Sequence, residues 1–457
     1  MSETISQPTG QKVNLVTEVP GERSKSLREK EDALLAPGLQ GFALKAGIVV
    51  KEARGSAVTD LDGNTFLDVI GGIGVNGLGH SHPKFVQAIQ SQVAKASVGS
   101  FSSESRLELL ERLCAHAPAP NLTRPQFYSG GSEAVESALR LAKNFTGNFE
   151  FISFDGGFHG KTMGTLSLMG SSFKDTYGPF VPGSHILPYP NPYRPPSGST
   201  QENCADFCID YLRKYIKEKT SKKIAAIIVE PMQGTAGNII PPKEFLPELK
   251  NIAQENGALL IADEMITGFG RTGTYWGCEH SGVTPDIVTL GKQFGGGYPL
   301  SALLGREDIV QAKPWSNPSG SSSSYGGNPL AMAAAAASLK IIDEEGLVEN
   351  SKVVGEYFLS KLKPFEQRYP FVGEVRGLGL LLGIELVEDK KTKKPLSRSV
   401  TEQFFLECLK RGLLTMSYAA SFRIQPSMTI DCETVDSVVD ILQETFDYIA
   451  EKRIWKN

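Results

Sequence analysis

The sequence lacks the features that mark membrane, secreted and nucleic-acid-binding proteins. No apolar run reaches the ~18 residues that a membrane-spanning helix needs. The polar N-terminus has no basic start followed by an apolar core, so no secretory signal is expected. Lys and Arg number 47 against 51 Asp and Glu, and the net charge of -4 gives no reason to expect a nucleic acid or an anionic membrane as partner.

Cysteine is also scarce. The six cysteines among 457 residues show no spacing typical of a disulfide framework, so we expect a reduced, cytoplasmic protein. Cys204 and Cys208 fall on one helical face, but two thiols without further ligands make a poor metal site, and no metal is expected.

The length allows roughly two to three domains. Residues 1–40 form a polar N-terminal arm, and residues 48–68 alternate apolar and polar residues around Asp62-Gly63, which predicts a hairpin. We expect 41–100 to be the N-terminal part of a small domain and its linker, 101–345 a large domain, and 346–457 the rest of the small domain. Residues 372–387 read as one strand with a close backbone approach at its glycines.

Between about residues 107 and 330, apolar runs alternate with amphipathic helices. This pattern predicts an α/β domain whose mostly parallel sheet is covered by helices on both faces. The expected strands are 150–154, 224–230, 258–263, 287–290 and 301–304, and helices are expected at 243–256 and 331–345.

Two expected strands end on ionisable residues, Asp263 and, two residues beyond the second strand, Lys292. The carboxyl ends of parallel strands face the crevice where α/β proteins bind ligands, so this pair indicates chemistry. Flexible glycines follow the lysine, and burial would make its amine a better nucleophile.

Two glycine-rich stretches could bind phosphate. Gly130, Gly131 and Ser132 precede an amphipathic helix, whose free N–H groups and positive dipole end suit an anion. Residues 268–273 satisfy the dinucleotide pattern G-x-G-x-x-G, but no helical period follows them, so that reading is rejected. A lysine, a carboxylate and a phosphate cradle together fit pyridoxal phosphate.

From about residue 40 onward the sequence resembles the class III aminotransferases, pyridoxal phosphate enzymes of fold type I. The resemblance is carried, in order, by GHSHP, SGGSEAVESALRLAK, FHGKT, VEPMQGTAG, ADEMITGFGRTG, PDIVTLGK, GGNPLA, VRGLGLLLGIEL and FRIQP. It implies a large domain with a mostly parallel sheet and a smaller α+β domain built from both chain ends. It also implies transfer of an amino group from an amine or ω-amino acid to a 2-oxo acid, pyruvate being favoured, through a lysine Schiff base and 1,3-proton transfer.

The resemblance also implies roles for individual residues. Lys292 would be the Schiff-base lysine and Asp263 the partner of the pyridine nitrogen, while Ser324 would reach the phosphate of a neighbouring subunit in a homodimer or higher homo-oligomer. Arg423 would receive a substrate carboxylate. The cofactor site would further contain Gly130, Gly131, Ser132, Phe158, His159, Glu230 and Met265.

Three positions depart from the 4-aminobutyrate and ornithine pattern. Ile266 replaces a glutamine and cannot hydrogen-bond the ring hydroxyl of the cofactor. Lys161 replaces an arginine that grips a distal carboxylate, and Thr235 replaces a glutamate that pairs with the carboxylate-binding arginine. They favour a broad amine or ω-amino acid:pyruvate aminotransferase.

Three alternatives stay open. Dialkylglycine decarboxylase is similar over several motifs, but its carboxylate-orienting glutamine is Ile73 here. A class III amino acid racemase shares all the cofactor residues. A cofactor-free scaffold of the same fold is the non-enzyme reading.

Overall fold

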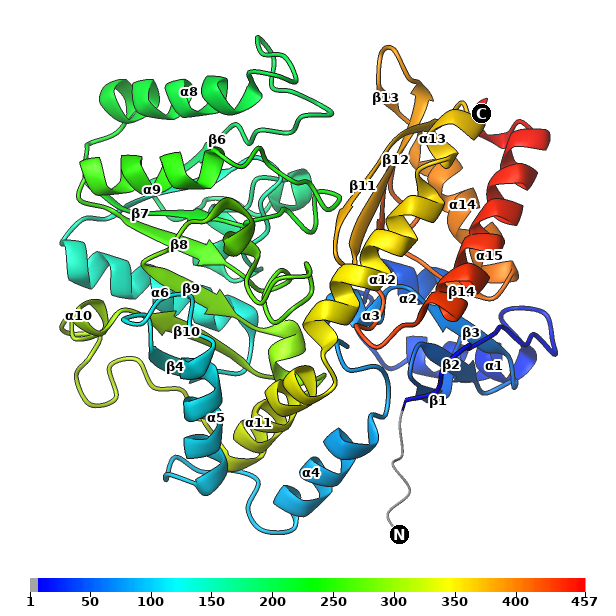
Figure 1. Cartoon of the computed structure of the whole chain (residues 1–457), viewed down its shortest axis with the longest axis horizontal. Helices are drawn as coiled ribbons and strands as arrows, with labels where there is room; N and C mark the ends of the chain where they lie inside the picture. The colour runs from blue at the N-terminus through cyan, green and yellow to red at the C-terminus, as the bar shows by residue number, and fades with distance from the viewer. Residues whose placement is uncertain (1–6, 457) are drawn as a thin grey trace. The chain divides into compact units, whose positions relative to one another are not determined.

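A computed structural model describes residues 7–456 (Figure 1). The chain divides after Val86 and after Val348 into two compact units, one formed by both chain ends and one by Gln87–Val348. The domain boundaries expected at residues 40, 100 and 345 stay predictions, because a division by contacts need not coincide with units that fold separately. No helix in the described part of the chain is long and apolar enough to cross a membrane.

The unit Gln87–Val348 contains a seven-stranded sheet in the order β4-β10-β9-β8-β7-β5-β6. The pairs among β6, β5, β7, β8 and β9 are parallel, whereas β10 runs antiparallel to both β9 and β4. The strands are β4 (Arg124–Tyr128), β5 (Glu150–Phe154), β6 (Ser184–Leu187), β7 (Ile224–Val229), β8 (Leu259–Asp263), β9 (Ile287–Leu290) and β10 (Ser301–Gly305).

All five strands expected from the sequence are present, and the prediction of a mostly parallel sheet is confirmed. Strands β4 and β6 were not predicted. Strand β4 begins with Arg-Pro and β6 begins with Ser-His, so neither carries the apolar run by which the inner strands were recognised.

Helices cover this sheet. Every residue of β7 and β8 is therefore buried, as expected for inner strands of a parallel sheet. Helix α6 packs against β7 to β10, and α9 packs against β7 and β8. The helices of this unit are α5 (Glu104–Ala115), α6 (Gly131–Thr146), α7 (Met163–Ser167), α8 (Cys204–Lys219), α9 (Phe245–Glu255), α10 (Glu307–Val310) and α11 (Pro329–Glu344). Helices α4 (Pro83–Val93) and α12 (Leu347–Leu362) contain the boundaries between the units.

The unit of the two chain ends is α+β. Its strands are β1 (Val50–Arg54), β2 (Ala57–Asp60), β3 (Thr65–Asp68), β11 (Val372–Leu378), β12 (Leu381–Asp389), β13 (Lys394–Pro395), β14 (Leu413–Leu414) and β15 (Ser421–Ile424). Its other helices are α1 (Glu22–Asp32), α2 (Gly41–Ala46), α3 (Gly71–Gly74), α13 (Phe365–Arg368), α14 (Arg398–Lys410) and α15 (Cys432–Glu451). The polar arm expected at 1–40 therefore contains helix α1, while residues 1–6 lie outside the described residues.

The predicted hairpin at Asp62-Gly63 is confirmed as the turn between β2 and β3, and β1 extends it to a meander. The prediction of one strand over 372–387 is wrong. The chain forms two antiparallel strands, β11 and β12, because Gly379 adopts a left-handed φ of 53° and reverses its direction.

The close backbone approach predicted for these glycines is confirmed at Gly379. Its carbonyl lies so near Gly355 of α12 that a Cβ added to Gly355 would overlap it.

Replacing Gly355 by alanine should therefore destabilise the protein. Although alanine favours a helix by about 1 kcal/mol over glycine, the backbone clash should outweigh this and lower the free energy of unfolding by about 1–3 kcal/mol. Urea unfolding measures the change. Gly41→Ala is the matched control, since nothing lies within 4 Å of a Cβ added there. Equal stability of the two variants would contradict the packing argument.

Candidate functional site

The two ionisable residues singled out in the sequence meet at one edge of the large sheet. Strands β8 and β9 are parallel, and Asp263, the last residue of β8, pairs with Thr289 of β9. Lys292 follows three residues later. The two strands therefore deliver the carboxylate and the lysine to the same edge, as predicted.

The expected phosphate cradle lies at this edge because β4, which leads into α6, runs in the same direction as β8 and β9. Ser301, the first residue of β10, pairs with Tyr128, the last residue of β4. The Ser301 hydroxyl donates to the carbonyl of Gly130 at 2.7 Å, which fixes the residue that precedes α6. The N-terminal turn of α6 therefore opens at the same edge, and its N–H groups and dipole suit an anion.

The Asp263 carboxylate is 1% exposed and accepts three hydrogen bonds. Its Oδ2 accepts from Nδ1 of the buried His159 at 2.7 Å, and its Oδ1 accepts from the Thr289 hydroxyl at 3.0 Å and from the Met265 amide at 3.2 Å. Burial lowers the pKa of His159, but the hydrogen bond and charge of Asp263 and the charge of Glu230 outweigh it, so this pKa lies above its ordinary value.

Glu230, which follows β7, joins two loops at this edge. One carboxylate oxygen accepts from the Phe158 amide at 2.8 Å and the other from the Gly234 amide at 3.1 Å. Burial raises the pKa of this carboxyl group. Glu230 therefore holds the loop that carries His159 rather than facing open solvent.

Lys292 has a φ of 50°, a left-handed conformation that is rare for a residue with a side chain. Such strain persists where the surroundings enforce it, and it clusters at functional sites. Here the next residue, Gln293, is fully buried, and its amide donates to the carbonyls of Ile266 and Gly268. This bond ties the turn at Lys292 to the loop after Asp263.

Met265 explains two glycines at the edge. A Cβ added to Gly291 would lie 2.5 Å from the Met265 sulfur, and one added to Gly131 would lie 3.1 Å from it. A side chain at either position would displace this thioether. In the first turn of α6, the Ser132 hydroxyl accepts from the Lys161 amide at 3.2 Å.

The remaining predicted residues fall into two groups. Lys161, Thr235 and Ser324 lie in the same unit as Asp263 and are exposed, and the Lys161 ammonium lies 4.5 Å from the centre of the Phe173 ring. Ile73 and Arg423 belong to the unit of the chain ends, so their part in the site stays a prediction. Ile73 adopts a φ of 65°, an outlier for a β-branched residue, in the glycine-rich turn α3.

Sequence reasoning missed Thr289 and Gln293. Thr289 lies within the recognised motif PDIVTLGK and Gln293 directly follows it, but a hydroxyl in a strand or an amide after a lysine carries no signal of its own. Residues 264–276 contain turns and no helix, which confirms that GFGRTG does not open the helix of a dinucleotide site.

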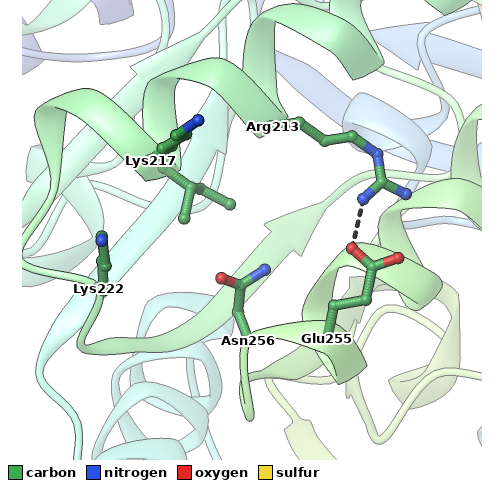
Figure 2. Close-up of a pocket in the computed structure, with 6 residues that line it drawn as sticks. Arg213, Lys217, Lys222, Glu255 and Asn256 are labelled. Atoms are coloured by element: carbon green, nitrogen blue, oxygen red, sulfur yellow. Dashed lines mark hydrogen bonds and ion pairs between the residues drawn. The ribbon is translucent and has the colours of Figure 1, made fainter.

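A hollow of about 310 Å³ elsewhere on this unit is a weaker candidate for the functional site. It lies between the C-terminal ends of α8 and α9, which lead into β7 and β8, and hence at the opposite edge of the sheet from Asp263 (Figure 2). Arg213 points toward Glu255 there and also bonds Glu248 at 3.3 Å. Its charge is thus already compensated.

The residues at the Asp263 edge fit pyridoxal phosphate. The hydrogen-bonded carboxylate suits a protonated ring nitrogen, the lysine suits the aldehyde carbon, and the start of α6 suits the phosphate. The glycines at positions 131 and 291 make room for the Met265 thioether at this edge.

Known proteins resemble the chain over most of its length. Residues 43–446 match the family model described as aminotransferase class-III. The chain is 36% identical to a probable 4-aminobutyrate aminotransferase of Bacillus subtilis (strain 168), over 80% of this chain and 84% of that protein. It is 33% identical to an alanine/serine racemase of Pyrococcus horikoshii, over 94% of this chain and 91% of that protein. The structure of a PLP-bound amine transaminase from an uncultivated Pseudomonas species superimposes on this chain with a TM-score of 0.85. The two sequences are 32% identical, and the match covers 91% of this chain and 98% of that one.

The raised pKa of His159 predicts a pH dependence of the cofactor-free protein. Its stabilising contribution is complete below the unfolded pKa of 6.5 and is lost as the pH rises through the higher folded pKa. We expect His159→Gln to make the decline in the free energy of unfolding above pH 6.5 shallower.

Urea unfolding at several pH values between 6 and 9 measures this slope. His280→Gln is the control, because burial lowers the pKa of His280 and its titration contributes nothing to the decline above pH 6.5. An unchanged slope in His159→Gln would contradict the assignment.

Proposed function

This chain belongs to the class-III aminotransferases and depends on pyridoxal phosphate, and from that premise we propose that it transfers an amino group from an amine or ω-amino acid to a 2-oxo acid, with pyruvate as the favoured acceptor. The observation that carries the assignment of its site is the convergence of Asp263, Lys292 and the start of α6 at one edge of the sheet.

Each group at this edge has a separate task in the proposed reaction. Bound pyridoxal phosphate supplies an electron-accepting ring that stabilises the charge left when a proton leaves the substrate carbon. Lys292 would hold the cofactor through its amine and, once displaced by the substrate amine, would carry that proton. Asp263 would keep the ring nitrogen protonated, and His159 would keep Asp263 in place.

Phe158 and Met265 are proposed to lie against the two faces of the ring. Both are half-buried, as expected of side chains that border a ligand site. Gly130, Gly131 and Ser132 would hold the phosphate through the N-terminal turn of α6.

The substrate side supports amines more than 2-oxoglutarate. Ile266 is buried and would lie 3.0 Å from a Cβ added to Gly234, so an apolar side chain stands where the 2-oxoglutarate enzymes have a glutamine that bonds the ring hydroxyl. Thr235 is uncharged, where the 4-aminobutyrate pattern has a glutamate. Lys161 offers a charge without the bidentate fork that an arginine presents to a carboxylate.

We propose a homodimer or higher homo-oligomer with shared sites. Ser324 is exposed on the segment between α10 and α11. Large apolar side chains of the same unit are also exposed, with Phe101 at 90%, Val98 at 66% and Tyr325 at 65%. A second subunit covering this surface would bury them and bring Ser324 toward its phosphate.

Racemisation is the second candidate function, because the chain resembles a racemase over nearly its whole length. The half-reaction separates the possibilities. Purified protein is mixed with a panel of amines and amino acids. Cofactor amination with release of a carbonyl product is expected; inversion without amination would indicate a racemase, and carbon dioxide release from 2-aminoisobutyrate as the main outcome would indicate a decarboxylase.

Lys292→Ala should lower the transamination rate by roughly 10³-fold or more and remove the visible absorption of the lysine-linked cofactor. Lys217→Ala, on α8 in the hollow between α8 and α9, is the control and should behave as wild type. A wild-type protein without this absorption, in which Lys292→Ala changes nothing, would favour the cofactor-free scaffold. Full activity and colour in Lys292→Ala would show that Lys292 is not the Schiff-base lysine.

Arg423→Ala should impair substrates that carry a carboxylate more than simple amines. The loss of a charge-assisted pair predicts roughly a 10- to 100-fold fall in kcat/KM for the former and a change within about threefold for the latter. Steady-state kinetics with one amine and its ω-carboxylated analogue measure the difference. Equal losses for both would show that Arg423 acts only in the fold.

A further inference from the structure

We propose that Thr289 is a positioning residue for the reaction. Its hydroxyl fixes the orientation of the Asp263 carboxylate and favours the charged form of that group. Because this hydroxyl occupies Oδ1, Oδ2 is left as the oxygen that receives the ring N–H. This inference rests on the proposed function and deepens it. Thr289 would contact Asp263, not the substrate.

The contact is short, buried and set by the sheet. The Thr289 hydroxyl donates to Asp263 Oδ1 at 3.0 Å, and the two side chains are 0% and 1% exposed. The two residues are also strand partners across β8 and β9. The Thr289 carbonyl accepts from the Glu264 amide at 3.0 Å, so the backbone next to Asp263 is tied to the same residue.

The donors are distributed unequally between the two carboxylate oxygens. A carboxylate offers about four acceptor positions, two on each oxygen. On Asp263, Oδ1 accepts from Thr289 and from the Met265 amide, whereas Oδ2 accepts from His159. Among the described residues, Oδ1 is therefore saturated and Oδ2 keeps one acceptor position.

Threonine suits this task better than a longer polar residue. Its β-branched side chain has restricted χ1 freedom, so the hydroxyl is held toward Asp263 at little entropic cost. A buried hydroxyl also needs a partner, and the carboxylate supplies it. The bond thus stabilises the strand pair and the carboxylate at once.

Losing the hydroxyl should change the charge balance at the cofactor. A hydrogen bond to the ionised form of a carboxylate favours that form, so without it the carboxylate is a poorer partner for a positively charged ring nitrogen. The proton shared with the ring nitrogen then lies closer to the carboxylate. A less positive ring is a weaker electron acceptor and raises the proton affinity of the nitrogen that Lys292 contributes.

The test compares Thr289→Val, which keeps the shape and removes the hydroxyl, with Thr289→Ser, which keeps the hydroxyl. For Thr289→Val we expect kcat to fall roughly tenfold, the effect of one hydrogen bond to a charged group, with KM within about twofold. The pH midpoint of the visible absorption of the bound cofactor should rise by about half a unit or more. Thr289→Ser should restore kcat to within about threefold of the wild-type value, and the pH midpoint of the absorption to within a few tenths of a pH unit.

Ser153→Ala is the matched control. Ser153 is equally buried in β5 of the same sheet, and its hydroxyl has no hydrogen-bond partner among the described residues. Its removal should leave kcat and the absorption midpoint unchanged. The thermal midpoint of each cofactor-free variant reports on folding, and Thr289→Ala replaces Thr289→Val if the valine variant does not fold.

An unchanged absorption midpoint in folded Thr289→Val or Thr289→Ala would overturn the inference. So would equal effects in Ser153→Ala, or no rescue in Thr289→Ser. The absorption midpoint does not depend on the amine substrate, so it is measured even if the wild-type protein catalyses racemisation instead of transamination. Failure of the proposed function and failure of this inference are therefore distinguished.

Discussion

A carboxylate inside a protein keeps its charge only when donors surround it, and this constraint shapes the candidate site at Asp263. Its three donors come from different parts of the chain: His159 from the loop after β5, Thr289 from β9, and the amide of Met265 from the turn that follows β8. Satisfying one buried acid therefore fixes two loops and a strand relative to each other. The loop of His159 is held in turn by Glu230, which bonds the Phe158 amide.

Strand direction supplies the rest of the site. Strand β4 runs in the same direction as β8 and β9, so α6, which follows it, begins at the Asp263 edge. Because β10 is antiparallel to both neighbours, its first residue, Ser301, lies at this edge and binds the carbonyl of Gly130. This bond holds the N-terminus of α6 at the edge where β8 and β9 end, so that an anion and a ring can be bound together there.

The features recognised from the sequence were those with a strong local pattern. The fully buried strands β5, β7, β8, β9 and β10 carry apolar runs, and all were predicted. Strands β4 and β6 lack such runs, and the glycine that separates β11 from β12 was taken for a close approach within one strand. Lys292 and Asp263 stood out because an ionisable residue after an apolar run is unusual. Thr289 and Gln293 did not, because their roles exist only through partners distant in sequence.

By itself, the sequence determined which residues can do chemistry and on which strands they lie, since residue type and periodicity are local properties. It also determined family membership, because nine motifs occur in order. Only the tertiary structure decided which groups meet: the pairing of β8 with β9, the reversal of β10, and the donors that Asp263 accepts. A hydrogen bond joins two groups that are neighbours in space. Their spacing along the chain does not determine this proximity, whereas the register of the sheet does.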